Sequence, residues 1–95
     1  MLSEVIQLFL VDCPLRLAAI KSAVEARNAV ALCTEAHGLK GAAGNLSAVS
    51  LFETAEILEQ LGREGRFDAA EAAWRKLADE ATNVLDALRR NEAAA

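Results

Sequence analysis

The sequence predicts an all-α fold, an antiparallel up-down four-helix bundle with a short additional N-terminal helix. Three observations support this prediction. The 95 residues are 54% hydrophobic but only 4% aromatic and include one proline, a composition that favours helices packed through small side chains. Apolar residues recur at alternating steps of three and four in successive segments. A chain of this length forms one domain with a modest core, so we expect residues 1–95 to carry one functional surface.

The short N-terminal helix is expected over residues 1–12, because the segment from Ser3 to Asp12 is strongly apolar. Pro14 is expected to separate this helix from the next one, since proline is tolerated in the first turn of a helix but disrupts its interior. The four helices of the bundle are then expected at residues 14–27, 29–44, 48–61 and 67–90.

The first two bundle helices each present one apolar stripe. Asn28 lies between them and is predicted to cap the second. The stripe of the segment 14–27 consists of Leu17, Ile20 and Val24. The stripe of the segment 29–44 and the residues just after it consists of Leu32, Ala36, Leu39, Ala43 and Leu46.

The last two bundle helices show the same spacing. Ser47 or Ser50 is the predicted cap of the segment 48–61, which is expected to end at the loop from Gly62 to Gly65. Its apolar residues are Leu51, Ala55 and Leu58, with Ile57 and Leu61 widening the stripe. The segment 67–90 has the most regular stripe, made of Phe67, Ala70, Trp74, Leu77, Ala81, Val84 and Leu88. Because Phe67 and Trp74 fit this pattern, we interpret them as core residues rather than a ligand platform.

Charge and hydropathy argue against several classes of function. The net charge is −4 without a cluster of Lys or Arg, so the electrostatic attraction on which nucleic-acid binding depends is missing, and we expect no nucleic-acid partner. The N-terminus lacks the basic region of a secretory signal, and no segment approaches about 18 uninterrupted apolar residues. We therefore expect a cytoplasmic domain without membrane contact, with Cys13 and Cys33 reduced.

The stretch Ala36-His37-Gly38-Leu39-Lys40-Gly41, followed by Ala42-Ala43-Gly44-Asn45-Leu46, is the candidate functional site. A glycine inside a helix costs about 1 kcal/mol relative to alanine, so three glycines here indicate a constraint other than helix stability. At about 100° per residue, His37 lies about 140° from the centre of the apolar stripe and should face outward. Gly41 shares that side, and Lys40 lies one turn from His37.

The residues His37-x-Leu39-Lys40-Gly41, with Gly44-Asn45-Leu46 after them, resemble the signature of histidine-containing phosphotransfer (HPt) domains. The resemblance extends to the helical layout of essentially the whole chain. It implies a phosphorelay intermediate that accepts a phosphoryl group on His37 from a receiver-domain aspartate and passes it to the aspartate of another response regulator. One departure is Gly38, where the family often has a hydroxyl or a larger polar residue.

The residues suit this chemistry. An exposed neutral imidazole can attack a phosphoryl group, and Lys40 supplies a positive charge for the phosphoryl oxygens. Gly38, Gly41 and Gly44 are expected to leave room for the partner, because positioning is most of what phosphoryl transfer requires. The sequence has no nucleotide-binding loop of a kinase. We therefore expect a phosphotransfer protein without kinase activity or a bound cofactor, with Mg²⁺ supplied by the partner receiver as the resemblance implies.

The expected partners are response-regulator receiver domains and a hybrid sensor kinase. We expect the domain to bind them as a monomer. The expected docking residues near the histidine are Leu8, Val11, Leu15 and Thr34. A series of charged residues is interpreted as an ordinary solvated helix face: Glu53, Glu56, Glu59, Arg63 and Glu64.

Two alternative functions stay open. The first is a helical adaptor that docks receivers without being phosphorylated. The second is a metal-binding bundle, in which Cys33 and His37, four residues apart on one helix, would need a third ligand such as Glu35 or Glu64. We expect no metal site, because two such residues are too few.

Overall fold

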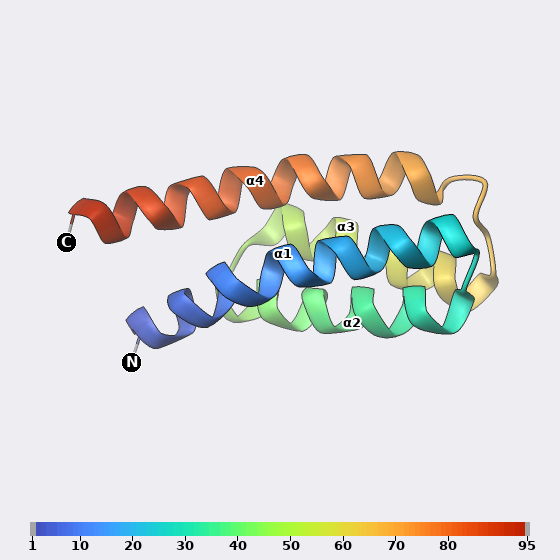
Figure 1. The fold of residues 1–95 in the computed structure, drawn as a ribbon, viewed down its shortest axis with the longest axis horizontal. Helices are drawn as coiled ribbons and strands as arrows, with labels where there is room; N and C mark the ends of the chain where they lie inside the picture. The colour runs from blue at the N-terminus through green and yellow to red at the C-terminus, as the bar shows by residue number, and fades with distance from the viewer. Residues whose placement is uncertain (1, 95) are drawn as a thin grey trace.

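The computed structural model describes residues 2–94, and these form four helices without a strand. The helices are α1 (Leu2–Ala26), α2 (Ala29–Asn45), α3 (Val49–Glu64) and α4 (Ala70–Ala94). Successive helices run in opposite directions (Figure 1). Helix α1 packs on α2 and α4, and α3 packs on the same two helices, so the four form a closed ring. The predicted all-α bundle is confirmed.

The core lies on the predicted stripes. The α2 residues Leu32, Ala36, Leu39 and Ala43 are fully buried, as are Leu51, Ala55 and Leu58 of α3 and Ala70, Leu77 and Ala81 of α4. Phe67 and Trp74 are partly buried against this core. The indole Nε1 of Trp74 donates a hydrogen bond to the backbone oxygen of Leu17 at 3.0 Å, which joins α4 to α1. Ile57 is 49% exposed, so its predicted place in the α3 stripe is wrong.

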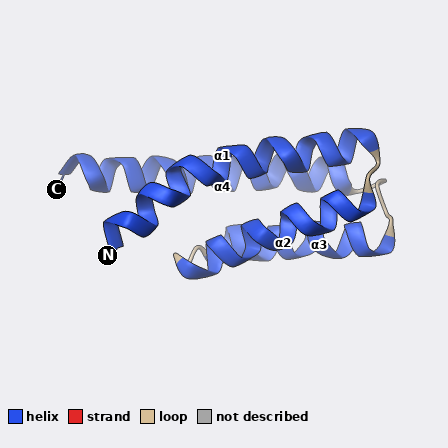
Figure 2. Ribbon diagram, turned by 60° about the horizontal axis from the view of Figure 1, so that its bottom comes forward, coloured by secondary structure: helices blue, strands red, loops and turns tan. Residues whose placement is uncertain are grey.

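Helix α1 runs through Pro14 without a break. The residues expected to form a separate short helix are helical, apart from Met1, which lies outside the described residues, but they are continuous with the first bundle helix. Proline removes one backbone hydrogen-bond donor and crowds the preceding turn. Here the result is a change of direction part-way along α1 (Figure 2), so Pro14 bends the helix rather than ending it.

The end of α2 that follows Asn28 agrees with the sequence expectation, whereas both ends of α3 differ from it. Asn28 caps α2 as predicted, with its side-chain oxygen accepting a hydrogen bond from the Ala31 amide at 3.1 Å. No serine caps α3: its cap residue is Ala48, because Ser47 takes a positive φ of 55° in the tight turn that ends α2. Helix α3 continues through Gly62 to the left-handed Gly65.

Helix α4 begins at Ala70 rather than at residue 67. Phe67 still packs on the core, but it does so from the loop before the helix. Within the described residues, no helix combines the length and apolar character that a membrane span requires.

Candidate functional site

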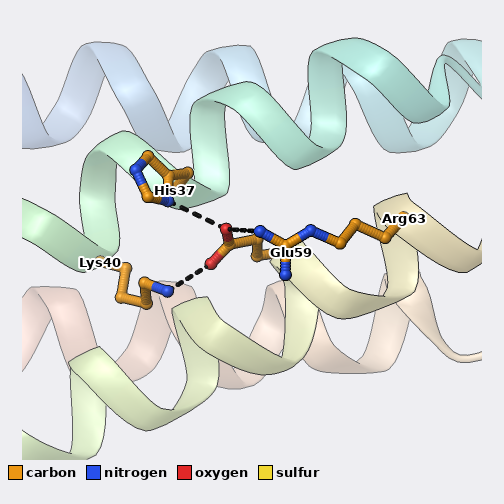
Figure 3. A network of polar contacts seen from close by, with 4 residues as sticks. All are labelled: His37, Lys40, Glu59 and Arg63. Carbon is orange, nitrogen blue, oxygen red and sulfur yellow. Dashed lines mark hydrogen bonds and ion pairs between the residues drawn. The ribbon is translucent and has the colours of Figure 1, made fainter.

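His37 lies in the middle of α2 and its side chain is 67% exposed, on the outward face that the helical geometry predicts. Its Nδ1 atom lies 2.9 Å from Oε2 of Glu59 on α3. The other ring nitrogen, Nε2, points away from Glu59 (Figure 3). The imidazole is therefore held on one side by its own protein and open on the other.

Glu59 is the centre of this arrangement, because its side chain is only 2% exposed. Its Oε1 lies 2.6 Å from Nζ of Lys40, and its Oε2 lies 2.7 Å from a guanidinium nitrogen of Arg63. We call His37, Lys40, Glu59 and Arg63 the His37 cluster (Figure 3). One buried carboxylate thus joins two cations and one imidazole from two helices.

The electrostatics of the His37 cluster keep Glu59 ionised. The hydrogen bond from Lys40 lowers the pKa of the Glu59 carboxyl below its ordinary value, although burial acts in the opposite direction. The contact with His37 and the charge of Arg63 lower this pKa further. Buried carboxylates are stable when they are paired in this way.

The protonation pattern of His37 follows from this carboxylate. An ionised carboxylate accepts hydrogen bonds and cannot donate them, so Nδ1 must carry the ring proton that points at Glu59. In the neutral imidazole the lone pair is then on Nε2. The nitrogen that faces the solvent is the one that can act as a nucleophile.

Close packing between α2 and α3 brings Glu59 within reach of His37. Gly62, one turn after Glu59, is buried, and a Cβ atom there would lie 2.7 Å from the backbone nitrogen of Cys33. Only glycine allows the two backbones to approach so closely. Gly62 therefore fixes the distance between the helices that carry the His37 cluster.

The three glycines of α2 have different surroundings. A Cβ at Gly41 would meet nothing within 4 Å, and one at Gly44 would make ordinary contact with the ring of Phe52 at 3.5 Å. At Gly38 a Cβ would lie 2.7 Å from Cζ of Arg16. The space beside Gly38 is thus filled by a side chain of α1, which differs from the expectation that it is left open for a partner.

The residues expected to dock a partner lie at the surface. Leu8, Val11 and Leu15 of α1 are 69%, 65% and 66% exposed, and Thr34 of α2 is exposed on the His37 side. We call the first three the α1 apolar stripe. An exposed row of large aliphatic side chains is unusual for a surface that meets only water.

The alternative metal site has no support in the described residues, where no three His, Cys, Asp or Glu side chains gather. Cys33 and Cys13 are free thiols. Burial, helped by the charge of Asp12, raises the pKa of the Cys13 thiol to about 11, so this side chain behaves as a small apolar core residue.

Comparison with known protein families adds to this geometry. A family model described as Hpt domain matches residues 4–91. The chain belongs to the Hpt domain family. This Hpt domain also matches the crystal structure of histidine-containing phosphotransfer protein B (HptB) from Pseudomonas aeruginosa PAO1, with a TM-score of 0.92 and 27% sequence identity over 96% of this chain and 79% of that one. No curated protein matches the sequence.

Membership of the family fixes the general activity of this Hpt domain. Hpt domains are phosphorelay intermediates that carry a phosphohistidine between response regulators, and they are phosphotransfer carriers rather than kinases. They interact with receiver domains and kinases of these relays.

Sequence reasoning found two members of the His37 cluster and missed the other two. Glu59 was assigned to a solvated face with Glu53, Glu56, Arg63 and Glu64, and it is buried while the others are exposed. The position of Glu59 in the sequence could have indicated its burial. Glu59 follows the core residue Leu58 directly and lies one turn before both Arg63 and Gly62, where α3 approaches α2 closely. Nothing in the sequence identified Arg16 as the neighbour of Gly38.

Proposed function

We propose that His37 is the phosphoacceptor of this Hpt domain and that its Nε2 atom attacks the phosphorus of a receiver's aspartyl phosphate. The observation that supports this is the contact between Nδ1 and the buried Glu59 carboxylate. As the N–P bond forms, the bond between phosphorus and the aspartate oxygen breaks, and the aspartate leaves as a carboxylate. The ring keeps its Nδ1 proton and gains positive charge, which Glu59 stabilises as the carboxylate of a catalytic triad does.

Lys40 and Arg63 are the groups proposed to stabilise the phosphoryl oxygens. Together they provide two permanent cations beside the single carboxylate of Glu59, so one positive charge is in excess. The Arg63 side chain is 57% exposed, and it can turn from Glu59 to a phosphoryl oxygen without leaving a buried donor unpaired. Charge stabilisation of this kind is the main protein contribution to phosphoryl transfer.

The partner is proposed to be a receiver domain that docks on the α1 apolar stripe and on Thr34 beside His37. Gly41 leaves the next turn of α2 free of side-chain bulk, so the receiver's aspartate can approach Nε2 in line. The receiver would bring the Mg²⁺ that transfer requires. In this proposal the domain acts as a monomer, has no kinase activity of its own, and passes the phosphoryl group on to a second response regulator.

The test is incubation with a receiver that carries labelled phosphate on its aspartate, in the presence of Mg²⁺. The wild-type domain is expected to take up label that is labile in acid and stable in base, as a phosphohistidine is. His37→Gln should take up none, and label on this variant would refute the assignment of His37. Wild-type protein that binds receivers without taking label would support the adaptor function, and a stoichiometric metal in the purified protein would support the metal-binding one.

A further inference from the structure

We infer that Arg16 is a positioning residue for phosphotransfer, which fixes the α1 apolar stripe relative to His37 through the space left by Gly38. This inference rests on the proposed function, because it assumes that the receiver docks on the α1 apolar stripe. It assigns Gly38 to an intramolecular contact rather than to partner access.

The contacts of Arg16 join the two helices. Its Nε lies 2.6 Å from Oδ2 of Asp12, one turn earlier on α1, and a terminal nitrogen lies 3.5 Å from Oε1 of Glu35 on α2. All three side chains are about one-third exposed. Ion pairs that are partly withdrawn from water are less screened than those on an open surface.

Gly38 is what allows this contact. The guanidinium group occupies the position that a Cβ of residue 38 would take, directly beside His37 in the sequence. Any larger residue there would push the end of the Arg16 side chain outward. Because this end is flexible, the change would displace the guanidinium without disturbing the backbone of α2.

The place of this contact on α1 gives it a consequence for docking. Pro14 has no amide hydrogen to donate to the backbone oxygen of the preceding turn, and it lies between Asp12 and Arg16, which form an ion pair one turn apart. The first half of the helix carries most of the α1 apolar stripe, and beyond the bend it diverges from α4 (Figure 2). Arg16 therefore holds α1 to α2 within one turn after Pro14.

A receiver seated on the α1 apolar stripe meets Nε2 of His37 only if α1 and α2 keep one relative position. A displacement of about 1 Å between docking surface and reacting atom is enough to slow transfer substantially. The Arg16 contact thus contributes to the productive alignment of the complex, while the His37 cluster carries out the transfer itself.

A double-mutant cycle on Arg16 and Gly38 tests this inference. The variants are Arg16→Met, Gly38→Ala and the two together. Arg75→Ala is the control, because Arg75 forms an ion pair with Glu71, one turn earlier on the exposed face of α4. Transfer from a phosphorylated receiver is measured at increasing receiver concentration. Arg16→Met is expected to raise the concentration for half-maximal transfer about threefold to fivefold, the size of one partly exposed ion pair, with little change in the maximal rate.

Gly38→Ala is expected to have the same effect as Arg16→Met, and to have none when Arg16 is already methionine. If Gly38→Ala weakens docking equally in both backgrounds, the glycine serves the partner and the inference is wrong. An unchanged half-maximal concentration in Arg16→Met would also overturn it. The Arg75→Ala control is expected to behave as wild type.

Amide hydrogen exchange supplies a second measurement that needs no receiver. Both single variants should speed exchange in the first half of α1, and the double variant should not speed it further. If the wild type takes no label from any receiver, the proposed function fails, and the exchange cycle still decides whether Arg16 and Gly38 hold the helix. If exchange is unchanged in both single variants, the inference that the Arg16 contact at Gly38 holds α1 to α2 is wrong.

Discussion

Replacement of Glu59 by glutamine tests the electrostatic basis of the His37 cluster. Glutamine keeps the size of the side chain and one acceptor oxygen, but it removes the charge that pairs with Lys40 and Arg63. A hydrogen bond to a charged group contributes about 1.5–3 kcal/mol. The partners of Glu59 retain partial exposure and can be rehydrated, so we expect a loss near the lower end, about 1.5 kcal/mol, or roughly 6–12 °C in Tm for a domain of this size.

The loss should depend on pH in a defined direction. The pKa of Glu59 is lowered from an ordinary value of 4.5 in the folded protein. The stability that it contributes is therefore present above that value and is lost as the pH falls through the lowered one. Thermal unfolding of wild type and Glu59→Gln should differ most near neutral pH, and the two Tm values should converge in acid.

Rates of phosphotransfer to two Glu59 variants distinguish the effect of the Glu59 charge from the effect of its hydrogen bond, which orients the imidazole. The side-chain oxygen of glutamine can still accept a hydrogen bond from the Nδ1–H group of His37, whereas Glu59→Ala offers no acceptor and lets the ring change tautomer. We expect Glu59→Ala to transfer at least about tenfold more slowly than Glu59→Gln, the equivalent of one charge-assisted hydrogen bond. Glu56→Gln, on the exposed face of the same helix, is the control. Equal rates for the two Glu59 variants, or a Tm difference that is constant with pH, would refute this reasoning.

Three further outcomes are expected. Gly62→Ala should lower the free energy of unfolding by about 1–3 kcal/mol, because its Cβ meets the Cys33 backbone, whereas Gly41→Ala should raise it by about 0.5–1 kcal/mol. Urea denaturation compares the two variants, and equal effects would contradict the packing argument. Gly41→Leu should keep or raise the helix content seen by circular dichroism and slow transfer from a receiver, so an unchanged rate would contradict the steric role of Gly41. At pH 8 an alkylating reagent should modify Cys33 in the folded protein and reach Cys13 only on unfolding, because burial raises the pKa of Cys13 to about 11; mass spectrometry showing both thiols modified at equal rates would contradict this.

Much of the fold could be predicted because apolar residues at alternating steps of three and four indicate amphipathic helices. The stripes of α2 and α4 place small and large side chains at helical intervals, and the same residues are buried in the core or partly buried against it. The course of α1 was predicted less well. A proline at position 14 is compatible with both a break and a bend, and packing of α1 on two neighbouring helices favours the continuous helix.

The candidate site could be predicted in part. The outward direction of His37 follows from the geometry of one helix, and the position of Lys40 one turn away follows from the same geometry. Glu59 could not be placed, because its burial depends on the close approach of α3 to α2 at Gly62. Contacts between side chains of different helices, including that of Arg16 with Glu35, are tertiary properties that periodicity does not encode.

The ring of helices also has a kinetic consequence. All four residues of the His37 cluster lie on α2 and α3, which are neighbours in the sequence and joined by a short turn. Closure of the ring instead requires Trp74 to reach Leu17, 57 residues away. Local pairings form faster than distant ones. The His37 cluster is therefore expected to assemble before α4 packs on α1, and to stay formed when α1 and α4 separate transiently.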